Sequence, residues 1–119
     1  MGTVKCKGSQ GSWEADAHHP DGHVERLACA HQHWWKNGRY SDPLPTHLRK
    51  PEKKFSRYID LLRSTHRVIL TSDSTNDQKF RGEGFFTRAG YIGVFEISDI
   101  VLDDDGLRFN FVRRIANAE

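Results

Sequence analysis

Residues 91–116 read YIGVFEISDIVLDDDGLRFNFVRRIA, and this stretch decides the fold. Two long runs, 91–102 and 107–116, flank a turn that ends in Asp105-Gly106, a common hairpin pair. Alternation in the second run places Leu107, Phe109, Phe111 and Ile115 on one face, and Arg108, Asn110, Val112 and Arg114 on the other. A period of two is typical of a strand with one buried face. We therefore predict a half-buried antiparallel hairpin.

One helix is predicted from Pro51 to about Thr65, since proline suits the first helical position. Its apolar side chains recur at i, i+3, i+4 and i+7, and form a stripe that faces the sheet: Phe55, Tyr58, Ile59 and Leu62. Residues 68–71 follow as a short β-branched run without alternation. That pattern favours a central strand that is covered on both faces.

The first third of the chain is predicted to be a β-meander, with strands at 3–7, 12–17 and 24–33. Pro20 and Gly22 supply the turn between the last two strands. The segment from Trp34 to Pro45 is predicted to cross the surface as a loop, because its two prolines disfavour both helix and interior strand.

Together these elements predict a single α+β domain over residues 1–119, a small twisted antiparallel sheet or partly closed β-barrel with one main amphipathic helix. A chain of this length needs no disulfide or metal to bury a core. Cys6 and Cys29 are the two cysteines, and no apolar run is long enough to span a bilayer. We therefore expect a cytoplasmic protein with reduced thiols and no membrane contact.

Charge is concentrated in one segment of the chain. The formal net charge is only +2, but residues 47–67 hold seven Lys or Arg against two Asp or Glu, a local net of +5. Cationic side chains at helical spacing match the charge of a phosphate backbone. Aromatic rings in the preceding loop-like segment could stack on bases, and a glycine-bearing loop at 72–90 adds two arginines.

These features predict non-catalytic binding of RNA or DNA by a basic helix face and a Gly/Arg loop. The candidate binding residues are Lys50, Lys53, Lys54, Arg57, Arg81, Arg88, Trp34, Trp35 and Tyr40. The alternative is a protein-interaction or small-ligand module that uses the Phe85-Phe86 loop and the hairpin edge, with a homodimer through a sheet edge as one form of it.

Metal and enzyme chemistry find less support in the sequence. Cys29, His31 and His33 share a strand face and Cys6 lies on a second strand, but two closely spaced ligand pairs, typical of structural zinc sites, are absent. His18, His19 and His23 have no spacing that completes such a site. Nothing in the sequence positions a nucleophile or an acid/base pair, so no metal, cofactor or catalytic residue is assigned.

The order of elements in about the last 65 residues resembles the PUA-like superfamily, including its ASCH and EVE branches. An amphipathic helix precedes a central strand at 68–71, and a long loop separates that strand from the closing hairpin. The resemblance rests on this order rather than on a motif. It implies a barrel-like fold and recognition of RNA or modified bases through a basic cleft.

Overall fold

The computed structural model describes residues 2–8, 14–43, 53–72 and 90–119, with only the backbone given for residues 53 and 54. In chain order the elements are β1 Thr3–Lys7, β2 Glu14–His18, β3 Val24–His31, the 3-10 helix η1 Gln32–Trp34, β4 Trp35–Lys36, β5 Arg39–Asp42, α1 Lys53–Thr65, β6 Arg67–Thr71, β7 Tyr91–Asp103 and β8 Gly106–Ala118. The chain is therefore mostly β with one α-helix among its described residues.

The strands form one sheet in the order β1-β2-β3-β6-β7-β8-β5-β4, and β1 also pairs with β8. The predicted meander is confirmed, since β2 pairs antiparallel with both β1 and β3. The prediction of an antiparallel sheet is wrong in two places, because β3 pairs parallel with β6 and β1 pairs parallel with β8. Parallel neighbours need a crossover connection, and the chain between β3 and β6 supplies it through α1.

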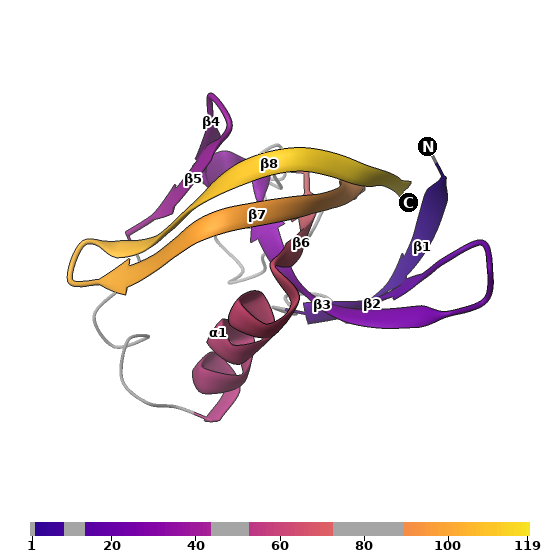
Figure 1. The fold of residues 1–119 in the computed structure, drawn as a ribbon, viewed down its shortest axis with the longest axis horizontal. Coiled ribbons are helices and arrows are strands. Elements are labelled where there is room, and N and C mark those ends of the chain that lie inside the picture. The colour runs from indigo at the N-terminus through magenta and orange to yellow at the C-terminus, as the bar shows by residue number, and fades with distance from the viewer. Residues whose placement is uncertain (1, 9–13, 44–52, 73–89) are drawn as a thin grey trace, which may run out of the picture.

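The pairing of β1 with β8 makes the sheet ring-like, but it is not the partly closed barrel of the prediction. Closure rests on a short pairing, with Thr3 opposite Asn117 and Val4 opposite Ala118, while β5 and β4 extend the sheet outside the ring. Figure 1 shows the β7–β8 hairpin arching across the molecule, with the two chain ends close together.

Two hydrophobic cores lie on opposite faces of the central strands. Val68 and Ala28 pack in the core that α1 covers, while Ile69 and Leu27 pack in the core next to β1 and β2. Because β3 and β6 are buried on both faces, they carry apolar side chains without alternation, as predicted for residues 68–71.

The predicted apolar stripe of α1 is confirmed, and its members are at most 7% exposed: Phe55, Tyr58, Ile59 and Leu62. Helix α1 ends where His66 adopts a left-handed conformation with φ of 52°, which stops helical hydrogen bonding. The predicted start at Pro51 lies outside the described residues. None of the described helices has the length and apolar character needed to cross a membrane.

The C-terminal hairpin is confirmed as β7 and β8, joined where Asp103 faces Gly106. Leu107 and Phe109 are buried in the core under α1, and Phe111 packs against it. Ile115 instead packs against the other core, so the prediction of one common face holds only for the first half of β8. Register shifts in the β7–β8 ladder accompany this change.

Candidate nucleic-acid interface

A short hairpin, β4–β5, occupies residues 35–42, within the segment from Trp34 to Pro45 that the sequence predicted to be a surface loop. Its turn is Asn37-Gly38, with φ of 53° and 79°, and positive values at both positions are typical of the two-residue turns that join strands tightly. Gly38 also accepts a hydrogen bond of 2.8 Å from the backbone N–H of Phe111, which fixes the turn against β8. The turn is therefore fixed by the strand pairing within the hairpin and by its hydrogen bond to β8.

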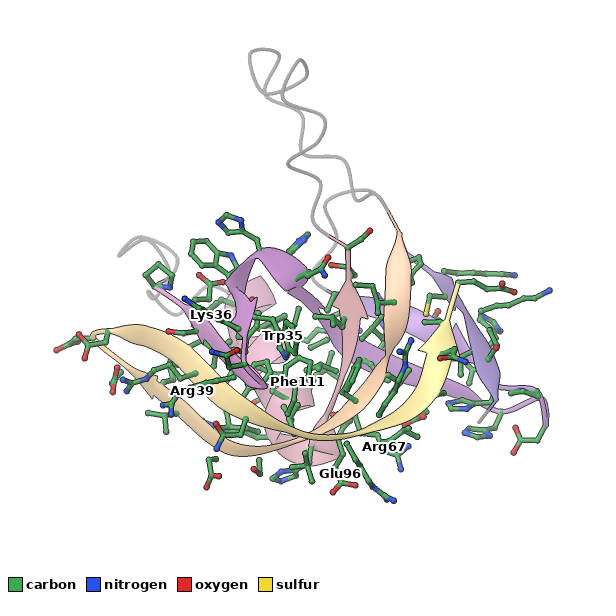
Figure 2. All side chains as sticks on the ribbon, turned by 90° about the horizontal axis from the view of Figure 1, so that it is seen from above. Trp35, Lys36, Arg39, Arg67, Glu96 and Phe111 are labelled. Carbon is green, nitrogen blue, oxygen red and sulfur yellow. The ribbon has the colours of Figure 1, made fainter. Side chains whose placement is uncertain are left out.

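Pairing within the hairpin sets which side chains share a face. Trp35 lies opposite Tyr40, and Lys36 lies opposite Arg39. Because neighbouring residues of a strand point to opposite faces, the aromatic pair lies on one side of the hairpin and the cationic pair on the other. Figure 2 shows Trp35, Lys36, Arg39 and Phe111 around this end of the sheet. We call these four residues the hairpin surface.

A row of aromatic rings leads from the core to this surface. Tyr40 stacks on Phe109 with ring centroids 4.6 Å apart, and Phe109 stacks on Phe111 at 5.7 Å. Phe111 in turn contacts Trp35 at 6.2 Å. Trp35 is 38% exposed although tryptophan is highly buried on average. The last ring of the row, the indole of Trp35, therefore contacts Phe111 and is also exposed to solvent.

The cationic pair is exposed and has no acidic partner among the described residues. Lys36 and Arg39 are direct cross-strand neighbours, an arrangement that is unfavourable for like charges. Asn110, the strand partner of Arg39 on β8, donates a hydrogen bond of 3.0 Å to Asp99. The positive charge of the pair therefore faces solvent.

The predicted basic helix face is only partly described. The Arg57 guanidinium lies 2.9 Å from Glu14, which belongs to β2, so its charge is compensated within the protein. The side chains of Lys53 and Lys54, and all of Lys50, lie outside the described residues. The predicted loop at 72–90 also falls outside them except for its two end residues, so Arg81 and Arg88 are not described.

The three aromatic side chains of the prediction comprise one exposed ring, one partly buried ring and one buried ring. Tyr40 is 2% exposed and is a core residue, so the prediction that it stacks on a base is wrong. Burial raises the pKa of Tyr40 well above its usual range, and its hydroxyl group donates to Asp42. Trp34 is partly buried against the core. Trp35 alone of the three is exposed as predicted.

The sequence prediction missed Lys36, Arg39 and Phe111 as members of a surface. The signal for the hairpin was present, because Asn-Gly between two short extended runs is the strongest short-range hairpin pattern. The contact of Trp35 with Phe111 joins residues that lie far apart in the sequence, and no local pattern indicates it.

Cys6, Cys29, His31 and His33, which the sequence analysis weighed as zinc ligands and did not assign, are not among the side chains that form a group of three or more close donor atoms in the described chain. Cys29 is 5% exposed and packs in the core that contains Val4, with Cys6 beside that core. Among the described residues, the one group of His, Cys, Asp and Glu side chains close enough to share an ion is His19, His23 and Glu25.

Comparison with known proteins finds no relative of the chain. No protein-family model matches the chain, and neither a curated protein nor a solved structure gives a match.

Proposed function

We propose that the protein binds single-stranded nucleic acid, without catalysis, at the hairpin surface. One observation carries the proposal: Lys36 and Arg39 face each other directly across a tight hairpin whose other face carries the exposed indole of Trp35. The sequence-based expectation of RNA or DNA binding, and the PUA-like resemblance, support the same class of ligand.

The cationic pair favours an anionic ligand. Side chains at directly opposed positions start about 5 Å apart, and two positive charges at that separation repel each other. A phosphate group between Lys36 and Arg39 would replace the repulsion with two attractive contacts, and the guanidinium can donate two parallel hydrogen bonds to it. Binding would also release counterions from the nucleic acid, which adds to affinity.

The indole favours an unpaired base. Trp35 is supported from behind by Phe111, so its ring is held in place before a ligand arrives. Stacking of a base on an aromatic side chain contributes about 1–3 kcal/mol. A base inside a double helix has both faces covered, so a ring of this kind suits single strands. A nucleic-acid strand that crosses the edge strand β4 would place a base against Trp35 on one side of the hairpin and a phosphate against Lys36 and Arg39 on the other.

Fluorescence anisotropy with labelled single-stranded RNA and DNA of about 16 nucleotides tests the proposal. Trp35→Ala is expected to weaken binding by about 5- to 150-fold, the equivalent of the stacking energy. Lys36→Gln combined with Arg39→Gln is expected to weaken it as well. Lys5→Gln is the matched control, because Lys5 is an exposed cation on β1, a strand that does not pair with the hairpin. Absence of binding by the unmodified protein, or equal losses in all variants, contradicts the proposal.

A second candidate, a protein-interaction module, is favoured by the open edge of β8. This edge pairs with β5 at residues 107–110 and with β1 at residues 117–118, and within the described chain no strand pairs with it between these segments. Val112, in that gap, is 52% exposed. An unpaired edge can accept an extended segment of a second copy. Light scattering over a range of concentrations tests for such a dimer, and Val112→Lys should dissociate it.

A further inference from the structure

The turn between β2 and β3 brings two histidines face to face. The backbone N–H of His19 donates to the carbonyl of His23 at 2.9 Å, and the N–H of Gly22 donates to the carbonyl of His19 at 3.0 Å. Gly22 has φ of 96°, which favours glycine and allows the tight turn. The two imidazole rings stack with centroids 3.9 Å apart and an angle of 10° between planes.

Glu25 completes a group of three potential metal ligands. Its Oε1 atom lies 2.5 Å from Nε2 of His19, in a hydrogen bond between the two side chains. One donor atom from each of His19, His23 and Glu25 lies within 4.8 Å of the other two. The side chains of His19 and Glu25 are only 12% and 21% exposed, so neighbouring groups restrict them, while that of His23 is 53% exposed and leaves a path from solvent.

Asp21 orients the second histidine from outside the group. Its Oδ1 atom lies 2.5 Å from Nδ1 of His23 and accepts the backbone N–H of the same residue at 3.0 Å. With Nδ1 donating to Asp21, Nε2 of a neutral His23 carries the free lone pair. A carboxylate that fixes a histidine in this way is the usual outer partner of a metal ligand.

We propose that His19, His23 and Glu25 bind a divalent transition-metal ion, with Zn²⁺ as the ion whose ligand preferences this set matches. The ion takes the place of the hydrogen between His19 Nε2 and Glu25 Oε1, and binding releases that proton. Bond lengths of about 2.0–2.1 Å in a tetrahedral site require these two atoms to separate to about 3.3 Å. Three protein ligands leave a fourth position for water.

Arg67 is the one cation that contacts this group among the described residues. Arg67 lies on the neighbouring strand β6, and its Nη1 atom is 3.2 Å from both carboxylate oxygens of Glu25. A carboxylate has enough lone pairs to bind an ion through Oε1 and keep Arg67 on Oε2. The charged groups around the ion are then the carboxylates of Glu25 and Asp21 and the guanidinium of Arg67. Their net charge is negative, which favours a cation.

Isothermal titration of the full chain with ZnCl₂, after removal of metals by a chelator, tests the proposal. One ion per chain is expected, and His23→Gln should lower the association constant by about tenfold to a hundredfold or more, while Asp21→Asn should lower it within the same range through the lost orientation. His33→Gln is the control and should change nothing. His33 follows the far end of β3, roughly 20 Å or more along the strand from the turn.

Absorption of the Co²⁺-loaded protein identifies the ligands independently. Visible bands of a tetrahedral site that disappear in His23→Gln are expected, with no thiolate-to-cobalt band in the near ultraviolet. No binding, binding unchanged in His23→Gln, or a thiolate band that is lost in Cys29→Ser would each overturn the proposal. Circular dichroism of each variant verifies its fold, and His23→Gln is the safest variant because its side chain is the most exposed of the three.

Discussion

The hydroxyl group of Tyr58 donates a hydrogen bond of 2.9 Å to the backbone carbonyl of Cys29, joining α1 to the central strand β3 inside the core. Tyr58→Phe removes this bond and keeps the ring. We expect the free energy of unfolding to fall by about 0.5–1.5 kcal/mol, as for a typical buried hydrogen bond. Urea denaturation followed by circular dichroism measures the change. An equal or higher stability of the variant would show that the bond contributes nothing.

The same tyrosine predicts how stability depends on alkaline pH. Burial raises the pKa of Tyr58, and that of Tyr40, above the ordinary value of 10.0. In the unfolded chain both groups lose protons near that ordinary value, whereas in the folded chain they stay protonated to higher pH. Stability is therefore full below pH 10.0 and falls as the pH rises above it.

Each buried tyrosine contributes up to about 1.36 kcal/mol of lost stability per pH unit in that range. Urea denaturation at about pH 9 and about pH 11 should show this fall, and Tyr58→Phe should make it less steep. A variant with the same pH dependence as the unmodified protein would contradict the prediction for Tyr58.

Gly106 is predicted to be intolerant of any side chain. A Cβ atom at this position would lie 2.1 Å from the backbone oxygen of Asp42 and 2.7 Å from Cα of Pro43, and its φ is 116°. Gly106→Ala combines overpacking with an unfavourable dihedral angle, so we expect a loss of about 3 kcal/mol or more. Thermal unfolding measures it.

Gly38 is the matched control for this substitution. It also has a positive φ, of 79°, in a hairpin turn, but no atom lies within 4 Å of the point that a Cβ atom would occupy there. Gly38→Ala should lose only about 1–2 kcal/mol from the dihedral angle. Equal losses at both glycines would show that the close approach of β5 to Gly106 is relieved by movement of the backbone.

The sequence predicts best the features that depend on a local pattern of apolar side chains. The stripe from Phe55 to Leu62 predicts the side of α1 that is buried, and the uninterrupted apolar run at 68–71 predicts a strand between two cores. Both predictions depend only on periodicity.

The missed features depend on pairings between distant segments. Tyr40 is buried because β5 pairs with β8 and places it opposite Phe109, which lies far along the chain. The same pairing decides that Trp35, rather than Tyr40, ends the aromatic row. His19 and His23 come together because a turn reverses the chain between them, and spacing alone did not indicate that both lie close to Glu25.

The two cysteines are predicted to differ in their reactivity toward iodoacetamide. Cys6 is partly exposed on β1, whereas Cys29 is 5% exposed in a core. A buried thiol is reached only when the protein opens, so under native conditions Cys6 should be alkylated first. Mass spectrometry of timed samples measures both rates, with a urea-unfolded sample as the control in which both thiols react. Equal native rates would contradict the burial of Cys29.

The salt dependence of nucleic-acid binding should separate the two halves of the hairpin surface. For single strands, log affinity falls against log salt concentration with a slope of about −0.7 for each phosphate contacted. Replacing Lys36 and Arg39 by glutamine should therefore make the slope shallower by about 1.4. Trp35→Ala should lower affinity at every salt concentration and leave the slope unchanged, because stacking displaces no counterions.

Anisotropy titrations at several salt concentrations give these slopes directly, with Lys5→Gln expected to retain the slope of the unmodified protein. If the double variant keeps the original slope, the cationic pair does not contact phosphate, and binding must use cations elsewhere. If Trp35→Ala changes the slope as much as the double variant does, the indole is only positioning Lys36 and Arg39 and does not stack on a base. Lys36 and Arg39 are direct strand neighbours, and Trp35 precedes Lys36 in β4. The effects of the two variants on the slope and on the affinity therefore distinguish phosphate contact from base stacking within one short hairpin.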